Sequence, residues 1–157
     1  MRIALINTGK TDKGFLLEGI ATYEKRLAHY CQFCSMDVNP GSSTAKLPPD
    51  LLKQKEAQMI LKKINPNDHV VLLDERGKQL KSTALASWLN RRLSGSAKRI
   101  VFVSGGAYGF HEDLYQRANE MISLSLLTFP HQLVRLIFLE QLYRAFTIIR
   151  NEPYHNE

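Results

Sequence analysis

Hydrophobic positions along the chain fall into two alternating patterns. Short continuous runs are typical of buried strands, and stripes with a spacing of three and four residues are typical of helices. The expected strands are Arg2–Asn7, Cys31–Val38, His69–Leu73, Ile100–Val103 and Ile122–Leu126. The expected helices are Phe15–Leu27, Leu51–Ile64, a segment capped by Ser82 that carries Leu85 to Leu93, Glu112–Met121 and His131–Arg150. Such alternation predicts a single α/β domain over residues 1–157, with a mostly parallel sheet and helices on both faces.

Candidate binding residues follow three of these strands. Ligands of parallel sheets sit beyond the carboxyl ends of the strands. Leu73-Asp74 lies at the end of the third strand, the loop Ser104–Gly109 follows the fourth, and Leu124–Phe129 follows the fifth. We therefore expect three neighbouring strand ends to line one pocket.

The loop Ser104–Gly109 contains three glycines, which lack a Cβ and let backbone approach a ligand closely. It matches neither the dinucleotide-binding nor the Walker glycine pattern, so a polyphosphate site is not indicated. The alternative interpretation is an ordinary turn from strand to helix.

The segment Leu124–His131 places hydroxyl groups and the first N–H groups of a helix beside apolar side chains. Such a surface suits an adenine ring and a thioether. The alternative is structural: Thr128 caps the last helix and Pro130 begins it.

The last helix is apolar on two sides. One stripe can face the sheet, and the other, with Glu140 and Arg144 beside it, then needs a cover. The simplest cover is an identical subunit across a two-fold axis, and the alternative is burial within the monomer. The first stripe is Val134, Phe138, Leu142, Ala145 and Ile149, and the second is Leu133, Ile137 and Ile148.

The chain carries 21 basic and 15 acidic residues, a net charge of +6, which suits a nucleic-acid partner but also serves solubility. A basic helix edge is expected at Arg91, Arg92, Lys98 and Arg99. The longest stretch without a charged residue is only 14 residues, Met121–Val134. Because a bilayer span needs about 20 apolar residues, no membrane helix is expected. The first residues lack the apolar region of a signal peptide, so we expect a cytoplasmic protein.

Metal and redox chemistry are not indicated. Cys31 and Cys34 are the only two cysteines, too few for a structural zinc site, and they fall in an expected strand rather than at a helix start. His69 and His111 have no evident partners. At the C-terminus, Tyr154 and His155 could stack on a substrate base and handle its proton, although the pattern alone favours a frayed, solvated end.

Several of these segments together resemble the RlmH family. The segments are Gly105-Gly106-Ala107-Tyr108-Gly109, Ser123–His131, Arg135, Glu140-Gln141-Leu142-Tyr143-Arg144-Ala145 and Pro153-Tyr154-His155. The resemblance runs from Met1 to the C-terminus, and the combination of motifs at these spacings is highly specific. RlmH proteins are small SPOUT-class methyltransferases that use S-adenosylmethionine to methylate N3 of a pseudouridine in large-subunit ribosomal RNA.

The resemblance implies a SPOUT-type fold with a C-terminal trefoil knot and a homodimer. The knot runs against the general rule that chains do not thread loops, so the periodicity does not predict it. The resemblance also places the cofactor, S-adenosylmethionine, at Leu73, Gly105, Leu124, Ser125, Leu126, Leu127, Thr128 and Phe129.

Three positions depart from the family pattern. Asn151 stands where a glycine is common, Asn156 where relatives usually carry Lys or Arg, and Ser104 where an aliphatic residue usually precedes the glycines. The second departure puts one contact with an RNA phosphate in doubt. None of the three removes a cofactor position.

The hypothesis for catalysis follows from motif position. A ring nitrogen that bears a proton needs a base before it can attack a methyl group, and we assign this role to His155, with Tyr154 and Arg144 as groups that orient the base and a phosphate. Two other functions remain open: a non-enzymatic ribosome-binding module and a flavodoxin-like nucleotide binder, for which only Thr8 and Thr11 follow the first strand.

Overall fold

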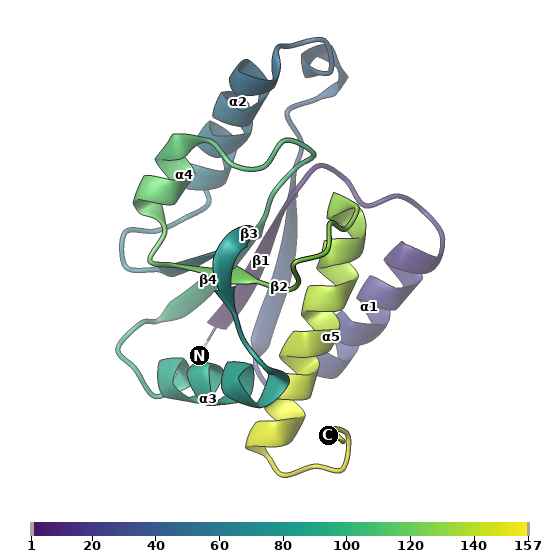
Figure 1. The fold of residues 1–157 in the computed structure, drawn as a ribbon, viewed down its shortest axis with the longest axis vertical. Coiled ribbons are helices and arrows are strands. Elements are labelled where there is room, and N and C mark those ends of the chain that lie inside the picture. The colour runs from purple at the N-terminus through teal and green to yellow at the C-terminus, as the bar shows by residue number, and fades with distance from the viewer. Residues whose placement is uncertain (1, 157) are drawn as a thin grey trace.

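A five-stranded sheet runs through the middle of the molecule, with helices on both faces (Figure 1). The structure is a computed structural model that describes residues 2–156. The strands are β1 (Arg2–Thr8), β2 (Gln32–Val38), β3 (His69–Gln79), β4 (Arg99–Ser104) and β5 (Glu120–Ser123). They lie in the order β2-β1-β4-β3-β5, and every neighbouring pair is parallel. The predicted α/β fold with a parallel sheet is confirmed.

Each face of the sheet is covered by its own set of helices. The helices are α1 (Phe15–Leu27), α2 (Pro49–Leu61), α3 (Ser82–Leu93), α4 (Glu112–Arg117) and α5 (His131–Ile149), and a short 3-10 turn spans Ser42–Thr44. In β1, Ile3 and Leu5 pack against α1, α3 and α5, whereas Ala4 and Ile6 pack against α2 and α4. Alternate side chains of a strand point to opposite faces, and here both faces are buried. This double burial is why the strands are continuous apolar runs.

Among the element boundaries that differ from the predicted ones, those of α3, α4 and β5 have a visible cause or consequence. Lys81, not Ser82, occupies the N-cap position of α3, and the Ser82 hydroxyl donates instead to Gln141 Oε1 of α5 at 2.8 Å. Helix α4 ends at Arg117 because Asn119 pairs with the backbone of Val70, through its own N–H (2.9 Å) and through its side-chain oxygen (2.7 Å). The chain is thereby turned into β5, which ends at Ser123 rather than at Leu126.

Strand β3 is longer than predicted and folds around β5. Ile122 pairs with Leu73 and also with Lys78, five residues further along β3. A strand residue has only two edges, so the two segments of β3 must flank β5 on opposite sides. Between them the backbone of Gly77 passes so close to β5 that a Cβ there would lie 2.6 Å from the Ile122 nitrogen.

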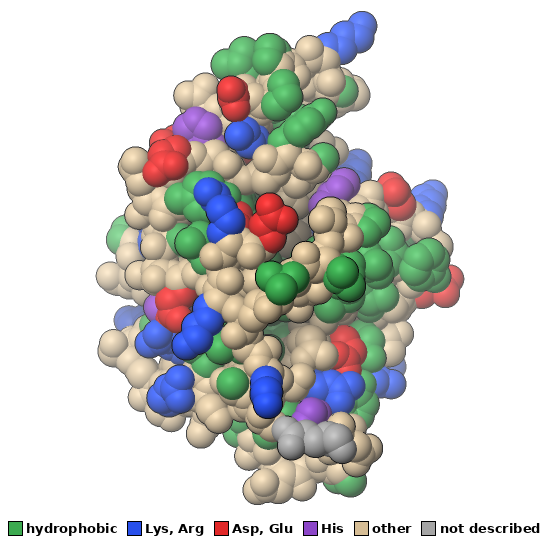
Figure 2. All heavy atoms as spheres, in the orientation of Figure 1, with side chains coloured by type: hydrophobic (Ala, Val, Ile, Leu, Met, Phe, Trp, Pro, Cys, Tyr) green, Lys and Arg blue, Asp and Glu red, His purple; other side chains and the backbone are tan. Residues whose placement is uncertain are grey.

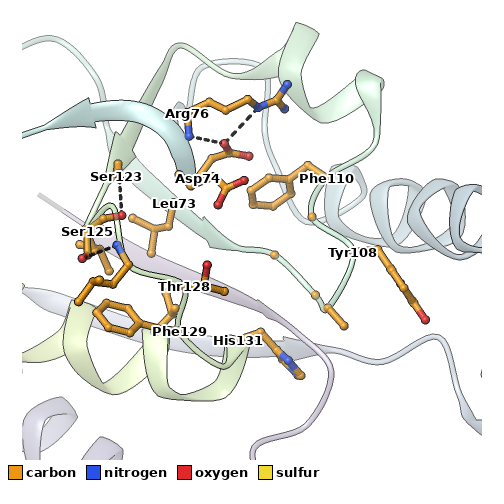
Figure 3. A pocket seen from close by; sticks show the side chains of 18 of the residues that line it. Leu73, Asp74, Arg76, Tyr108, Phe110, Ser123, Ser125, Thr128, Phe129 and His131 are labelled. Atoms are coloured by element: carbon orange, nitrogen blue, oxygen red, sulfur yellow. Dashed lines mark hydrogen bonds and ion pairs between the residues drawn. The ribbon is translucent and has the colours of Figure 1, made fainter.

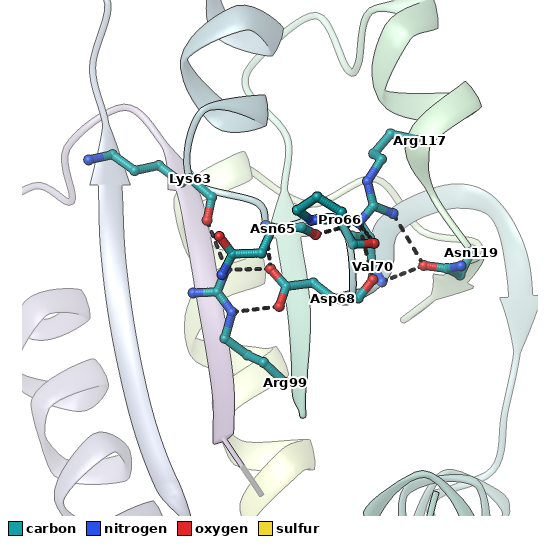
Figure 4. A network of polar contacts seen from close by, with 8 residues as sticks. All are labelled: Lys63, Asn65, Pro66, Asp68, Val70, Arg99, Arg117 and Asn119. Carbon is teal, nitrogen blue, oxygen red and sulfur yellow. Dashed lines mark hydrogen bonds and ion pairs between the residues drawn. The ribbon is translucent and has the colours of Figure 1, made fainter. Parts of the chain in front are cut away.

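A polar network fixes the loop that leads into β3 (Figure 4). The Asp68 carboxylate accepts hydrogen bonds from the Arg99 side chain and from the Asn65 N–H at 2.7 Å. Arg117 Nη2 donates to the carbonyls of Asn65 (2.9 Å) and Asp68 (3.1 Å). Arg99 is therefore committed to this loop.

The remaining part of the expected basic edge is also partly neutralised. Glu120 of β5 accepts hydrogen bonds from Arg92, from Trp88 Nε1 at 2.8 Å and from His69 Nε2 at 2.8 Å. The expectation that His69 lacks a partner was wrong, since Glu120 lies 51 residues away in sequence. His111 also has a partner, because its ring accepts the Asp113 N–H at 3.3 Å and caps α4.

Within residues 2–156, no helix has the length and hydrophobicity to cross a membrane.

Candidate functional site

A pocket of about 670 Å³ opens at the carboxyl ends of β3 and β4, beside the loop that follows β5. Figure 3 shows Leu73, Thr128 and Phe129 converging on its middle. Of the eight residues that the sequence assigned to a cofactor, seven line this one pocket: Leu73, Gly105, Leu124, Ser125, Leu127, Thr128 and Phe129. The eighth, Leu126, does not line it and is 82% exposed.

The glycine loop forms one wall as a tight turn. The Gly109 N–H donates to the Gly106 carbonyl at 3.2 Å, and Gly109 has φ of 78°, which favours glycine. A Cβ on Gly105 would lie 3.3 Å from the Phe110 ring, which also lines the pocket. A side chain at position 105 would therefore press on this ring, which would have to shift by a few tenths of an ångström.

The loop after β5 forms the opposite wall and is held by its own serines. The Ser123 hydroxyl donates to the Ser125 carbonyl at 3.0 Å, and the Ser125 hydroxyl accepts the Leu127 N–H at 2.9 Å. Pro130 occupies the N-cap position of α5, and no side chain caps the helix, so the structural alternative in which Thr128 caps it is wrong. Thr128 lines the pocket instead (Figure 3).

Among the charged groups at the pocket rim are Asp74, which the sequence placed at a strand end of the expected pocket, and Arg76, which it did not. The Asp74 carboxylate accepts hydrogen bonds from the Arg76 N–H at 2.8 Å and from the Tyr115 hydroxyl at 2.5 Å, and the Arg76 guanidinium lies over the Tyr115 ring at 4.2 Å. Burial, followed by the bond to Asp74, raises the pKa of Tyr115. These contacts fix the bend of β3 beside Leu73. A polar stretch after an apolar strand was the available signal, but it is equally typical of a solvated turn.

The C-terminal cluster, defined as Arg144, Tyr154 and His155, forms a second arrangement at the other end of α5. Arg144 Nη1 lies 3.3 Å from His155 Nδ1, and its guanidinium carbon lies 4.9 Å from the centre of the Tyr154 ring. Tyr154 and His155 are both half-buried, so the expectation of a frayed terminus was wrong.

The segment that carries this cluster is anchored to the body of the protein. Asn151 follows α5 with φ of 54°, a left-handed backbone conformation. Glycine and asparagine tolerate this conformation best, so asparagine can stand where the family commonly has glycine. Tyr30 lies in the turn that follows α1, and its hydroxyl donates to Glu152. This hydrogen bond is the main reason that the pKa of Tyr30 rises to about 12.

The pocket and the C-terminal cluster do not meet within one chain. His131, at the start of α5, lines the pocket, and Arg144 is 13 residues further along this helix. At 1.5 Å per residue the separation is about 20 Å. Figure 1 shows the C-terminus near the foot of α5, away from the loops that precede the helix.

Arg135 is the most buried ionisable side chain near the pocket, with 0% exposure. It donates from Nη2 to the Thr8 carbonyl and from Nη1 to the Thr11 hydroxyl at 2.7 Å. Thr8 in turn donates to the Ser104 carbonyl at 3.0 Å. Arg135 thus links α5 to the ends of β1 and β4. In the sequence Arg135 was one of the residues that resemble the family, but nothing there indicated that it would be buried.

Hydrophobic residues gather on the surface beside the pocket. Leu127 is 73% exposed and Phe15, at the start of α1, is 75% exposed. Figure 2 shows hydrophobic side chains over the α1 and α5 side of this face. Of the second stripe of α5, Ile148 packs against the core, whereas Leu133 and Ile137 are half-buried.

The fold and the pocket define an α/β domain with a pocket for a small ligand at the carboxyl edge of a parallel sheet. Residues 1–155 match the family model described as predicted SPOUT methyltransferase. Two relatives are each called ribosomal RNA large subunit methyltransferase H. The protein of Parabacteroides distasonis is 49% identical, with 100% of both chains covered, and that of Christiangramia forsetii is 47% identical, with 99% of both covered.

The chain therefore belongs to the SPOUT methyltransferases and, within them, to the ribosomal RNA large subunit methyltransferase H family, as its motifs had indicated. A solved methyltransferase from Legionella pneumophila, in complex with S-adenosylmethionine, aligns with a TM-score of 0.46 and 10% identity, covering 92% of this chain and 66% of that one. A likeness this distant says nothing about the site.

Proposed function

We propose that this chain methylates N3 of a pseudouridine in large-subunit ribosomal RNA, with S-adenosylmethionine as the methyl donor, in the cytoplasm. The observation that carries the proposal is the single pocket formed by three strand ends, in a chain of this methyltransferase family. Relatives named for ribosomal RNA support the substrate class.

The residues of the pocket fit S-adenosylmethionine. Leu73, Leu124 and Phe129 offer apolar walls for an adenine ring, and the Thr128 hydroxyl lies among them. The bare backbone at Gly105 allows close approach. The carboxylate of Glu75 at the rim suits a ligand that carries a sulfonium and an ammonium group, whereas the carboxylate of Asp74 is paired with Arg76. When bound, this cofactor supplies an electrophilic methyl group.

We further propose that the active unit is a homodimer. Methyl transfer requires reacting atoms within about 3–3.5 Å of each other, whereas Arg144 lies about 15–20 Å along α5 from the pocket residues Val134 and His131 of its own chain. A two-fold axis would bring the C-terminal cluster of one protomer to the pocket of its partner. The exposed Phe15, Leu126 and Leu127 would then be covered.

Within such a site, each residue of the C-terminal cluster has a separate task. Burial, a hydrogen bond with Tyr23 and the charge of Glu140 raise the pKa of Tyr154, so its hydroxyl stays protonated and its ring serves to orient the substrate. Arg144 Nη1 can only donate a hydrogen bond, so in this contact His155 Nδ1 is the acceptor. Engagement of a substrate phosphate by Arg144 would release Nδ1 to accept the proton from N3 of the pseudouridine.

The trefoil knot is part of the proposal. Strand β3 flanks β5 on both edges, which is the arrangement expected if the chain after β5 passes through a loop. The seven pocket residues lie on the segment after β5 and at the ends of β3 and β4.

One experiment tests the function directly. Ribosomes from a strain that lacks the gene are incubated with the purified protein and S-adenosylmethionine, and their large-subunit RNA is analysed by mass spectrometry. We expect one methyl group to be gained on one pseudouridine. Binding to ribosomes without any methyl gain, and without calorimetric binding of S-adenosylmethionine, would instead indicate a non-enzymatic ribosome-binding module.

A further inference from the structure

We propose that Glu140 is the positioning residue that holds the whole C-terminal cluster in one arrangement. The inference rests on the proposed function, because it concerns the residues assigned there to catalysis. It adds a carboxylate that neither accepts a proton from the substrate nor touches it.

A single oxygen of Glu140 accepts hydrogen bonds from two members of the C-terminal cluster. Glu140 lies one turn before Arg144 on α5, and its Oε1 accepts from Arg144 Nε at 3.1 Å and Nη2 at 2.6 Å. The same oxygen accepts the Tyr154 hydroxyl at 3.2 Å. Arg144 in turn reaches His155 with Nη1 at 3.3 Å. Two residues are thus held directly and the third through Arg144.

Glu140 is itself fixed from a different part of the protein. Its second oxygen accepts Gln141 Nε2 at 2.7 Å, and Gln141 Oε1 accepts the Ser82 hydroxyl of α3 at 2.8 Å. The carboxylate is therefore placed by α5 and α3 and not by the C-terminal segment.

The contacts determine which edge of Arg144 faces the substrate. A guanidinium presents five N–H groups in a planar fork, and two parallel bonds to a phosphate use one edge of it. Glu140 occupies the edge made by Nε and Nη2. The other edge, made by both Nη atoms, then faces the RNA backbone, and its Nη1 exchanges His155 for the phosphate. Without Glu140, the fork would be free to rotate.

The charge of Glu140 keeps both Arg144 and Tyr154 in their protonated forms. Arg144 faces it from α5, Tyr23 of α1 lies 3.4 Å from the Tyr154 hydroxyl, and Arg26 of α1 stacks on Tyr23. The bond to Glu140 is the main cause that raises the pKa of Arg144. The negative charge also helps to keep Tyr154 protonated.

The test is Glu140→Gln, which keeps the size of the side chain and removes the charge. We expect kcat for ribosome methylation to fall at least about tenfold, with the affinity for S-adenosylmethionine unchanged, since the pocket lies at the other end of α5. We also expect the Tyr154 hydroxyl of this variant to ionise at lower pH than that of the wild type. An absorbance titration measures this ionisation, and the signal of Tyr154 is the one that is lost in Tyr154→Phe. Glu140→Asp keeps the charge and should leave this titration closer to that of the wild type.

The matched control is Glu120→Gln, because Glu120 also accepts hydrogen bonds from three side chains but lies on β5, outside the C-terminal cluster. This control should keep the wild-type kcat and Tyr154 titration. Wild-type kcat in Glu140→Gln, or an equal loss in both variants, overturns the positioning role. If the wild type methylates nothing, the proposed function fails, and the Tyr154 titration still decides about Glu140: an unchanged titration in Glu140→Gln overturns it.

Discussion

The backbone of Gly77 crosses the backbone of Ile122 so closely that a Cβ on Gly77 would lie 2.6 Å from the Ile122 nitrogen. Real side chains do not approach backbone atoms to this distance, so the crossing of β3 over β5 depends on a residue without a side chain. The requirement comes from contact with another strand and not from an unusual backbone angle.

We predict that Gly77→Ala destabilises the protein by about 2 kcal/mol or more, because backbone, unlike a flexible side chain, has to shift to make room for the methyl group. Chemical denaturation measures the change. Lys78→Ala, at an exposed neighbouring position, is the control and should change stability by no more than about 0.5 kcal/mol. A wild-type midpoint for Gly77→Ala would contradict the crossing described here.

The buried side chain of Arg135 should be equally difficult to replace. Arg135→Met keeps much of the volume but leaves the Thr8 carbonyl without its partner, at a cost of about 2 kcal/mol. Because Thr8 also supports the start of the glycine loop, binding of S-adenosylmethionine should weaken as well. Calorimetry on the folded variant checks this second effect, and unchanged affinity would show that Arg135 supports the fold alone.

A shared active site makes a prediction about mixed dimers. Gly105→Val disturbs the pocket and His155→Ala removes the proposed base, so each variant alone should be inactive. If the two variants associate at random, half of the dimers are mixed and each has one intact site, so about a quarter of the wild-type activity should return. Methylation assays on co-expressed chains measure this recovery. Its absence would place pocket and base in the same chain.

The ion pair at the entry to β3 should make stability depend on acid. Burial pushes the pKa of Asp68 up, but hydrogen bonds from Arg99 and the Asn65 N–H pull it down further, so the net shift is downward. A depressed carboxyl pKa stabilises the fold above the unfolded value of 3.8, and this contribution is lost as the pH falls through the folded pKa.

Asp68→Asn should therefore lower stability by about 2 kcal/mol at neutral pH and flatten its decline below about pH 4. Denaturation midpoints between pH 7 and pH 2.5 measure both effects. Asp50→Asn is the control: Asp50 pairs with Lys53 at 3.3 Å, but its side chain is 92% exposed, so little change is expected. Parallel pH curves for wild type and Asp68→Asn would contradict the prediction.

Local patterns in the sequence predict the parallel sheet because each strand is a continuous apolar run that must be buried on both faces. They also bring Leu73, Gly105 and Thr128 to one edge, since the carboxyl ends of parallel strands share that edge. They do not predict the second half of β3, where polar residues around Gly77 are typical of a turn and become a strand only through contact with β5. The burial of Arg135 is not predicted for a similar reason. A charged residue is normally exposed, and the groups that pair with this one lie more than a hundred residues away in the sequence.

The two segments of β3 that flank β5 also constrain the order in which the chain can acquire its shape. Leu73 and Lys78 must leave a space that Ile122 then enters, so the β3 bend has to exist before or while the last strand arrives. Contacts between segments this distant in sequence form slowly, because the chain loses entropy before they stabilise it. Refolding should accordingly be limited by the arrival of β5, and a newly made chain reaches its native form only after its last third has left the ribosome.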